Sequence, residues 1–241
     1  MLAFYKIALA PILLLQGRRL RKTALRLPEA AGARSGTVEA GSGEPLGLLF
    51  IGDSSAAGVG VDSQREALAH QTAALVAGHV GRTVRWKLIA KTGVNTREAT
   101  ELVVAQNPGA ADIVICALGV NDATSQRNSG QFIKDYTALL QKVEQRTGNY
   151  AAVVSGLPPL HAFPALPQPL RWYLGQCAKR LDGALRNLCS GRSNMRFVPL
   201  TWSGADEMAP DKFHPGKGQY RQWAHLVAQE VIALWHLKSA A

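Results

Sequence analysis

Two segments far apart in the chain carry side chains that could together activate a serine for nucleophilic attack. Ser54 follows the apolar run 48–51, and Asp211 and His214 lie near the carboxyl end. A serine hydroxyl is a poor nucleophile unless a base takes its proton, and a carboxylate on the other imidazole nitrogen orients that base. Separation in sequence is no objection, because such groups are recognised by geometry and occur in different chain orders.

Small and polar residues follow three of the apolar runs. The segments concerned are 52–54, 91–95 and 119–122, and each contains a glycine. In an α/β protein, the carboxyl ends of parallel strands meet at one edge of the sheet, where side chains and free backbone N–H groups face a ligand. The sequence therefore predicts that these three segments lie together.

Short apolar runs alternate with longer segments of helical periodicity from residue 46 onward. The expected strands are 48–51, 84–90, 113–118, 151–155 and 196–199, and the expected helices are 65–77, 96–106, 131–145, 170–188 and 216–237. Nearly continuous apolar strands are typical of parallel sheets covered on both faces. This pattern predicts an α/β fold, a flavodoxin-like three-layer αβα sandwich around a mostly parallel five-stranded sheet, in a domain spanning 46–241.

Composition indicates an ordinary globular protein of 241 residues, with 47% hydrophobic and 18% charged residues. The net charge is +10, but six lysines and arginines precede the first acidic residue, Glu29, so the rest of the chain carries only +4. No basic stripe interleaved with aromatic residues occurs in the domain, which argues against nucleic acid as a partner. Three cysteines without C-x-x-C spacing favour neither a disulfide framework nor a zinc site.

The leader, residues 1–26, joins an apolar stretch to a cluster of basic residues. The stretch is shorter than the ~20 residues of a secure membrane span. The strongest charge follows the apolar stretch and no A-x-A-like site ends it, so cleavage as a secretory signal is not expected. The basic flank favours a membrane anchor or peripheral contact at the cytoplasmic face, and the alternative is a helix that packs on the domain. Export with an uncleaved or atypical signal stays open, as does a cytoplasmic location, and 27–45 is interpreted as a glycine-rich linker.

The four segments together resemble the SGNH hydrolases, also called GDSL-type esterases or lipases. Their four sequence blocks carry Ser, Gly, Asn and His, and here Ser54, Gly93, Asn121 and His214 occur in that order between residues 46 and 237. A single block is weak evidence for the family, because such short patterns arise by chance. Four blocks in order at expected strand ends or turns are a specific signal.

The resemblance implies a role for each matching residue. Ser54 would be the nucleophile, His214 the general base and then acid, and Asp211 the group that orients the imidazole. The backbone N–H groups of Ser54 and Gly93 and the side-chain amide of Asn121 would form the oxyanion hole.

Other motifs are incomplete. Ala56 stands where a G-x-S-x-G nucleophile elbow needs its last glycine, which disfavours the ordinary α/β-hydrolase fold. Ser63 breaks the G-x-G-x-x-G pattern that begins at Gly58, and no Walker loop or H-E-x-x-H helix occurs. We therefore expect neither a cofactor nor a metal.

The proline-rich loop 156–169 is the expected substrate contact. His161, Phe163 and Leu166 are its candidate residues, and an equal alternative is a loop that merely packs on the domain. An apolar wall and a membrane-facing leader favour a small-molecule or lipid ester, with lysophospholipid as one example. The resemblance thus implies a serine esterase that works through an acyl-enzyme on Ser54. A carbohydrate O-acetylesterase, an acyltransferase with the same residues and a non-catalytic binding module remain alternatives, and the oligomeric state stays open.

Overall fold

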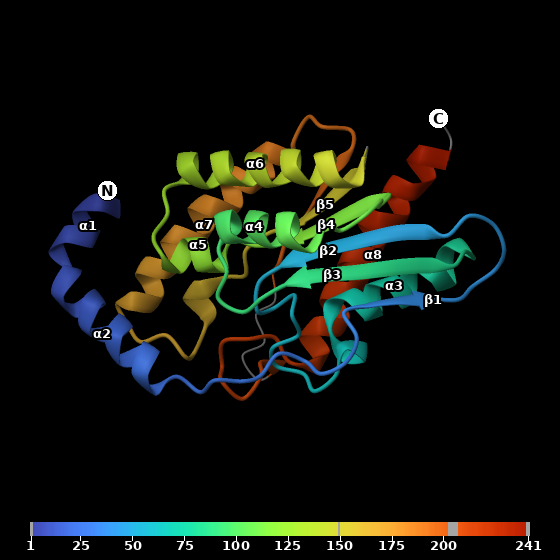
Figure 1. The fold of residues 1–241 in the computed structure, drawn as a ribbon. Helices are drawn as coiled ribbons and strands as arrows, with labels where there is room; N and C mark the ends of the chain where they lie inside the picture. Colours follow the sequence, from blue (N-terminus) through green and yellow to red (C-terminus); the bar gives the residue numbers. More distant parts are fainter. Residues whose placement is uncertain (1, 149, 202–206, 240–241) are drawn as a thin grey trace.

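The computed structural model describes residues 2–148, 150–201 and 207–239, which form a sheet with helices on both faces (Figure 1). Its six strands lie in the order β1-β3-β2-β4-β5-β6. They are β1 (Ser35–Val38), β2 (Leu46–Gly52), β3 (Val84–Ala90), β4 (Ile113–Ala117), β5 (Ala151–Ser155) and β6 (Met195–Val198). Strands β2 to β6 are parallel, and β1 is antiparallel to β3. The predicted three-layer α/β fold with a mostly parallel sheet is confirmed.

Two apolar cores, one on each face of the sheet, explain why the strand sequences are nearly continuously apolar. In β2, Leu49 and Ile51 join one core, while Leu48 and Phe50 join the other. Successive side chains of a strand point to opposite faces, so a strand covered on both sides needs apolar residues throughout.

The long helices divide between these two cores. On one face lie α4 (Thr96–Gln106), α6 (Ser129–Thr147) and α7 (Leu170–Cys189). On the other lie α3 (Leu68–Val80) and α8 (Lys217–Ser239). Three short elements complete the domain: η1 (Gln64–Glu66), α5 (Val120–Thr124) and η2 (Leu160–Ala162).

Strand β1 was not predicted, because it lies within the segment interpreted as a linker. It pairs along the edge of β3, and its side chains are mostly exposed, so the sequence carries no apolar alternation there. Gly36 suits this position, since a Cβ atom would come within 3.1 Å of the Trp86 indole nitrogen. The sheet therefore has six strands where five were expected, and 27–45 is not a free linker.

The leader forms two consecutive helices, α1 (Leu2–Ala8) and α2 (Ala10–Thr23), with Pro11 in the first turn of α2. They lie at one side of the molecule, beside α7 and away from α3 and α8 (Figure 1). Leu13 is buried against the domain. Within the described ranges, no helix has the length and apolar character needed to cross a membrane.

The register of the parallel strands brings the predicted segments together. Gly52, the last residue of β2, pairs with Ala90 at the end of β3 and with Ala117 at the end of β4. The loops after these three strands therefore leave the sheet side by side. This arrangement is the reason that Ser54, Gly93 and Asn121 can share one site.

Gly60 makes the close approach that joins the loop after β2 to the loop before α8. Its φ is +108°, and a Cβ atom there would stand 2.2 Å from the backbone oxygen of Pro215 and 2.9 Å from the Ala209 side chain. A side chain cannot occupy that space unless the backbone moves.

We therefore expect Gly60→Ala to lower the free energy of unfolding by about 2 kcal/mol or more, because it combines backbone strain with a steric clash. Urea denaturation measures this. Gly78→Ala is the matched control, since Gly78 lies in α3 with open space around the new Cβ, and it should raise stability by up to about 1 kcal/mol. Equal stability of the two variants would contradict the close approach.

Candidate active site

Ser54, His214 and Asp211 form a continuous hydrogen-bonded chain at the carboxyl edge of the sheet. The Oγ atom of Ser54 is 2.9 Å from Nε2 of His214, and Nδ1 of His214 is 2.5 Å from Oδ2 of Asp211. The side chains of His214 and Asp211 are 16% and 5% exposed, and Ser54 is 9% exposed, so solvent reaches the imidazole but hardly the carboxylate. This geometry allows the imidazole to take the serine proton while the carboxylate stabilises the resulting charge.

Asp211 is fixed by backbone donors as well as by the imidazole. Its Oδ1 atom accepts the backbone N–H groups of Phe213 and His214, each at 3.0 Å. Burial acts to raise the pKa of Asp211, but the hydrogen bonds from His214 and Phe213 outweigh it and hold the pKa below its usual value. Asp211 therefore stays ionised and keeps its charge on the imidazole at neutral pH.

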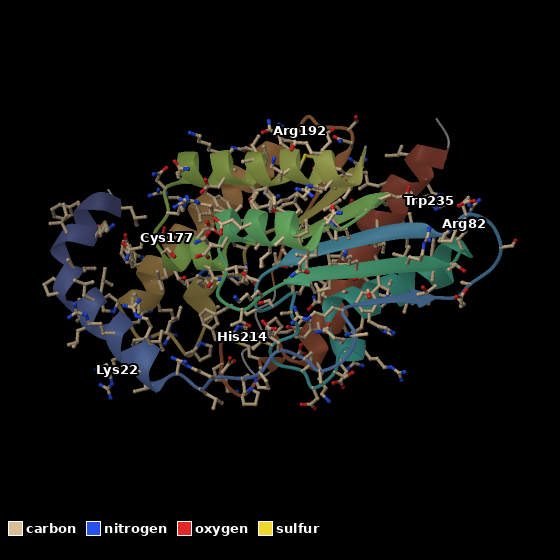
Figure 2. All side chains as sticks on the ribbon, in the orientation of Figure 1. Lys22, Arg82, Cys177, Arg192, His214 and Trp235 are labelled. Atoms are coloured by element: carbon tan, nitrogen blue, oxygen red, sulfur yellow. The ribbon has the colours of Figure 1, made fainter. Side chains whose placement is uncertain are left out.

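The loop that carries Ser54 is anchored from α8. The hydroxyl group of Tyr220, a fully buried residue, donates toward the backbone oxygens of Ser55 (2.7 Å) and Val59 (2.8 Å). Because α8 follows His214 directly in the chain, one helix positions both partners of the proton transfer. In Figure 2, His214 lies among the loops below the sheet.

Two backbone N–H groups in the adjacent loops after β2 and β3, those of Ser54 and Gly93, are unpaired. Within the described residues, neither Ser54 N–H nor Gly93 N–H donates to an acceptor of the chain. Gly93 has a φ of +86°, which favours glycine, and the space where a Cβ would stand is open. Donors held in place without a partner can stabilise an oxyanion with little reorganisation.

The side chain of Asn121, in α5, supplies a third donor near these two. Its Nδ2 atom donates to the backbone oxygen of Val94 at 2.9 Å and lies 3.4 Å from Oδ2 of Asp53. The second distance exceeds the usual range of about 2.7–3.2 Å, so that hydrogen can be transferred to a better acceptor at low cost. The bond to Val94 fixes the orientation of the amide beside the loop that carries Gly93.

Asp53 is a buried carboxyl group that is hydrogen-bonded to the loop carrying Ser54. Its Oδ1 atom accepts the backbone N–H of Ser55 at 3.1 Å. Burial raises the pKa of Asp53 to about 6, although the hydrogen bond from Ser55 and the charge of His214 act in the opposite direction. The geometry gives Asp53 no contact with a ring nitrogen of His214, which agrees with an internal hydrogen-bonding role.

Glu29 and Arg34, which hold the loop carrying Gly93, were not predicted. Oε1 of Glu29 accepts the backbone N–H and the hydroxyl of Thr92 at 2.6 and 2.7 Å, and Arg34 donates to Glu29 and to the backbone oxygen of Ala90. Both residues lie in the supposed linker, and a lone acid in a glycine-rich segment carries no motif that could have identified it.

Asp122 fixes the same loop at its other end. It is fully buried and accepts the backbone N–H and the hydroxyl of Thr96 at 3.0 and 2.9 Å, which ties α5 to the start of α4. Burial raises the pKa of Asp122, against the hydrogen bonds from Thr96. The two ends of the loop 91–95 are therefore both held by carboxyl groups.

A largely apolar cavity opens beside Ser54. Its empty volume is about 700 Å³, part of it open to solvent, and its wall includes Asp53, Ser55 and Pro215, which flank the catalytic groups. Apolar residues from the loops after β4, β5 and β6 and from α8 supply most of the rest, among them Leu118, Leu157, Phe163, Leu200 and Trp223. The hydroxyl group of Ser155, also in this wall, already accepts the indole N–H of Trp223 at 2.9 Å.

Of the three predicted substrate residues, the structure brings only Phe163 to this cavity. His161 is exposed, and its backbone and Cβ lie against Gly175 of α7. Leu166 is 1% exposed and belongs to the core between the sheet and α7. His161 and Leu166 therefore do not line this cavity, whereas Ala162 and Phe163, at the end of η2, do.

Within the described part of the chain, no group of three or more histidine, cysteine or acidic side chains could hold a metal ion. The three cysteines are free and buried.

Comparison with known proteins agrees with this geometry. A profile of the GDSL-like lipase/acylhydrolase family matches residues 50–226. No curated protein matches the sequence.

Three solved structures share the fold at low identity. The lipase Lip_vut3 from a goat rumen metagenome has a TM-score of 0.61 at 18% identity, with 76% of this chain and 96% of that one covered. A carbohydrate esterase family 2 enzyme with a carbohydrate binding domain, from Corynascus thermopiles (Myceliophthora fergusii), has a TM-score of 0.61 at 13% identity, covering 83% and 69%. The lipase/acylhydrolase from Enterococcus faecalis has a TM-score of 0.56 at 18% identity, covering 78% and 96%.

The contacts of Glu29 make a prediction about the loop 91–95. Glu29→Ala removes the acceptor of the Thr92 backbone N–H, so this loop should exchange its amide hydrogens about tenfold faster. Hydrogen-exchange mass spectrometry of the peptide that covers the loop measures the change. Glu44→Ala, a substitution of an exposed acid in the same segment, is the control, and an unchanged exchange rate in Glu29→Ala would refute the contact.

Proposed function

The chain belongs to the GDSL-like lipase/acylhydrolase family, and we propose that it hydrolyses carboxylic esters through an acyl-enzyme on Ser54. The hydrogen-bonded chain from Ser54 through His214 to Asp211 is the observation that carries this proposal. A binding module would need no such chain, nor unpaired N–H groups in the adjacent loops.

Each step of the reaction uses a group already in place. Ser54 Oγ attacks the ester carbonyl carbon as its proton passes to Nε2 of His214, and the oxyanion accepts hydrogen bonds from Ser54 N–H, Gly93 N–H and the Asn121 amide. The bond to the leaving oxygen then breaks, and the imidazolium protonates the alkoxide. Water attacks the acyl-enzyme by the same route and restores the serine.

The cavity beside Ser54 supports an aliphatic acyl group in the substrate. An acetyl group needs little space, whereas an apolar wall that includes Leu118, Leu157 and Phe163 gains free energy with each methylene it buries, about 0.8 kcal/mol. This favours a lipid or other long-chain ester over a sugar acetate. Transfer to an alcohol in place of water would use the same residues, so the product distinguishes an acyltransferase from a hydrolase.

The serine mechanism makes a sharp prediction. Ser54→Ala should lower kcat for p-nitrophenyl esters by at least about 10⁴-fold, because no nucleophile remains. A fluorophosphonate should add to wild-type protein at Ser54, and peptide mass spectrometry locates the adduct.

Ser55 and Ser155, which line the cavity, serve as internal controls for that experiment. An adduct on either of them, or undiminished turnover by Ser54→Ala, would contradict the assignment of Ser54 as the nucleophile. Absence of turnover by folded wild-type protein on esters from acetate to palmitate would favour a transferase or binding role.

The cavity wall predicts the preferred acyl length. Phe163→Ala should raise kcat/KM for long-chain esters relative to the acetate, because the smaller side chain enlarges the apolar cavity. Leu166→Ala in the same loop is the control, since Leu166 lies outside the lining and should change stability without moving the profile. The readout is the ratio between chain lengths, because Phe163 also contacts Phe213 edge to face, next to His214. An unchanged ratio in Phe163→Ala would remove this residue from the acyl site.

A further inference from the structure

Exposed large apolar side chains are concentrated on the first helices. Nine such side chains occur in the described residues, and seven of them lie between residues 4 and 25. Ile7 is 77% exposed and Leu15 is 67% exposed, and the remaining five are Phe4, Tyr5, Ile12, Leu14 and Leu25. Exposed apolar side chains gathered in one region of a protein surface indicate an interaction site.

The opposite side of the same helices already packs on the domain. Leu13 is buried, and Leu2, Leu9 and Leu20 contact the core between the sheet and α7. Tyr5 also packs edge to face on Trp172 of α7, with ring centroids 5.0 Å apart. The other six exposed apolar side chains are not needed for this packing, and they form an outward face of the described leader.

Basic residues continue this face toward the end of α2. Six cations are exposed, and none has an acidic partner within salt-bridge distance in the ranges described: Lys6, Arg18, Arg19, Arg21, Lys22 and Arg26. Residues four apart on a helix lie on one side, so Leu14, Arg18 and Lys22 form one row and Leu15 and Arg19 another. Each row is apolar toward the start of α2 and cationic toward its end.

We propose that this face of α1 and α2 docks on an anionic lipid bilayer. Apolar side chains such as Ile7 and Leu15 enter the boundary between headgroups and acyl chains, while the row of cations behind them meets lipid phosphates. A second copy of the chain is a poorer occupant, because it would bring two clusters of six cations together. Nucleic acid would pair with the cations but leave the apolar side chains in water.

The docking face is connected to the wall of the cavity. The side-chain amide of Gln16 donates to the backbone oxygen of Gln168 at 2.7 Å and accepts the backbone N–H of Leu170 at 3.1 Å. These residues end the loop 156–169, whose earlier part contributes Leu157 and Phe163 to the cavity. In Figure 2, Lys22 and His214 both lie on the lower side of the molecule. A bilayer on this face would bring lipid esters near the entrance of the site.

Cosedimentation of the full chain with lipid vesicles tests the proposal without requiring turnover. We expect binding to vesicles of phosphatidylcholine with phosphatidylglycerol, much weaker binding to phosphatidylcholine alone, and release as salt is raised. Replacing Arg18, Arg21 and Lys22 by alanine should weaken binding to the anionic vesicles about a hundredfold. Ile7→Ser with Leu15→Ser should weaken it by more than about tenfold.

Matched variants elsewhere on the surface should bind as the wild type does. For the cations these are Arg85→Ala, Lys134→Ala and Arg146→Ala together, and for the apolar residues Val104→Ser with Leu237→Ser. All variants should keep the wild-type rate on a soluble p-nitrophenyl ester.

Wild-type protein that stays in the supernatant with anionic vesicles would overturn the proposal. So would a dimer in sedimentation velocity that dissociates on Leu15→Ser, because a second copy would then occupy the face. Vesicle binding is independent of the serine chemistry, so an inactive protein that still binds would reject only the proposed hydrolase function.

Discussion

The hydrogen-bonded chain from Ser54 to Asp211 depends on the close packing of two loops that are 160 positions apart in the chain. Nε2 of His214 comes within 2.9 Å of Ser54 Oγ because the loop after β2 lies directly against the loop before α8. Gly60 makes that approach possible, and Tyr220 fastens the loop after β2 to α8 from below. A distance change of about 1 Å would break the hydrogen bond, so the packing of backbone against backbone controls the proposed proton transfer.

The oxyanion side of the site depends on strand register. Gly52 pairs with both Ala90 and Ala117, so the donors from three strand ends meet without long connections. Carboxylates then remove the freedom that the loop carrying Gly93 would otherwise have, Glu29 at one end and Asp122 at the other. The sheet therefore sets the positions of these donors, and the hydrogen bonds to Glu29 and Asp122 restrict the loop that carries Gly93 further.

Hydrophobic periodicity predicted the parallel strands and long helices because burial on both faces leaves a continuous apolar run. Ser54, Asp211 and His214 could be singled out because they lie at an expected strand end and a late turn and match blocks of a known family in order, and the structure joins them by hydrogen bonds. Strand β1 could not be predicted, because an exposed edge strand is held by backbone pairing that leaves no side-chain pattern. Glu29 acts through a long-range hydrogen bond, and only some side chains of the loop 156–169 line the cavity. Such contacts depend on tertiary placement, which spacing along the sequence does not specify.

The loop 156–169 joins three parts of the molecule that the chain order separates. Leu157 and Phe163 line the cavity. The Ala165 N–H donates to the backbone oxygen of Lys212, in the turn between Asp211 and His214. The end of the loop is hydrogen-bonded to Gln16 of α2. Prolines stiffen this loop, so a displacement at one attachment cannot be absorbed freely within it. The packing of α2 on the domain therefore bears on the shape of the cavity as well as on the surface that α2 presents. Through this loop, the N-terminal helices are physically connected to the proposed active site.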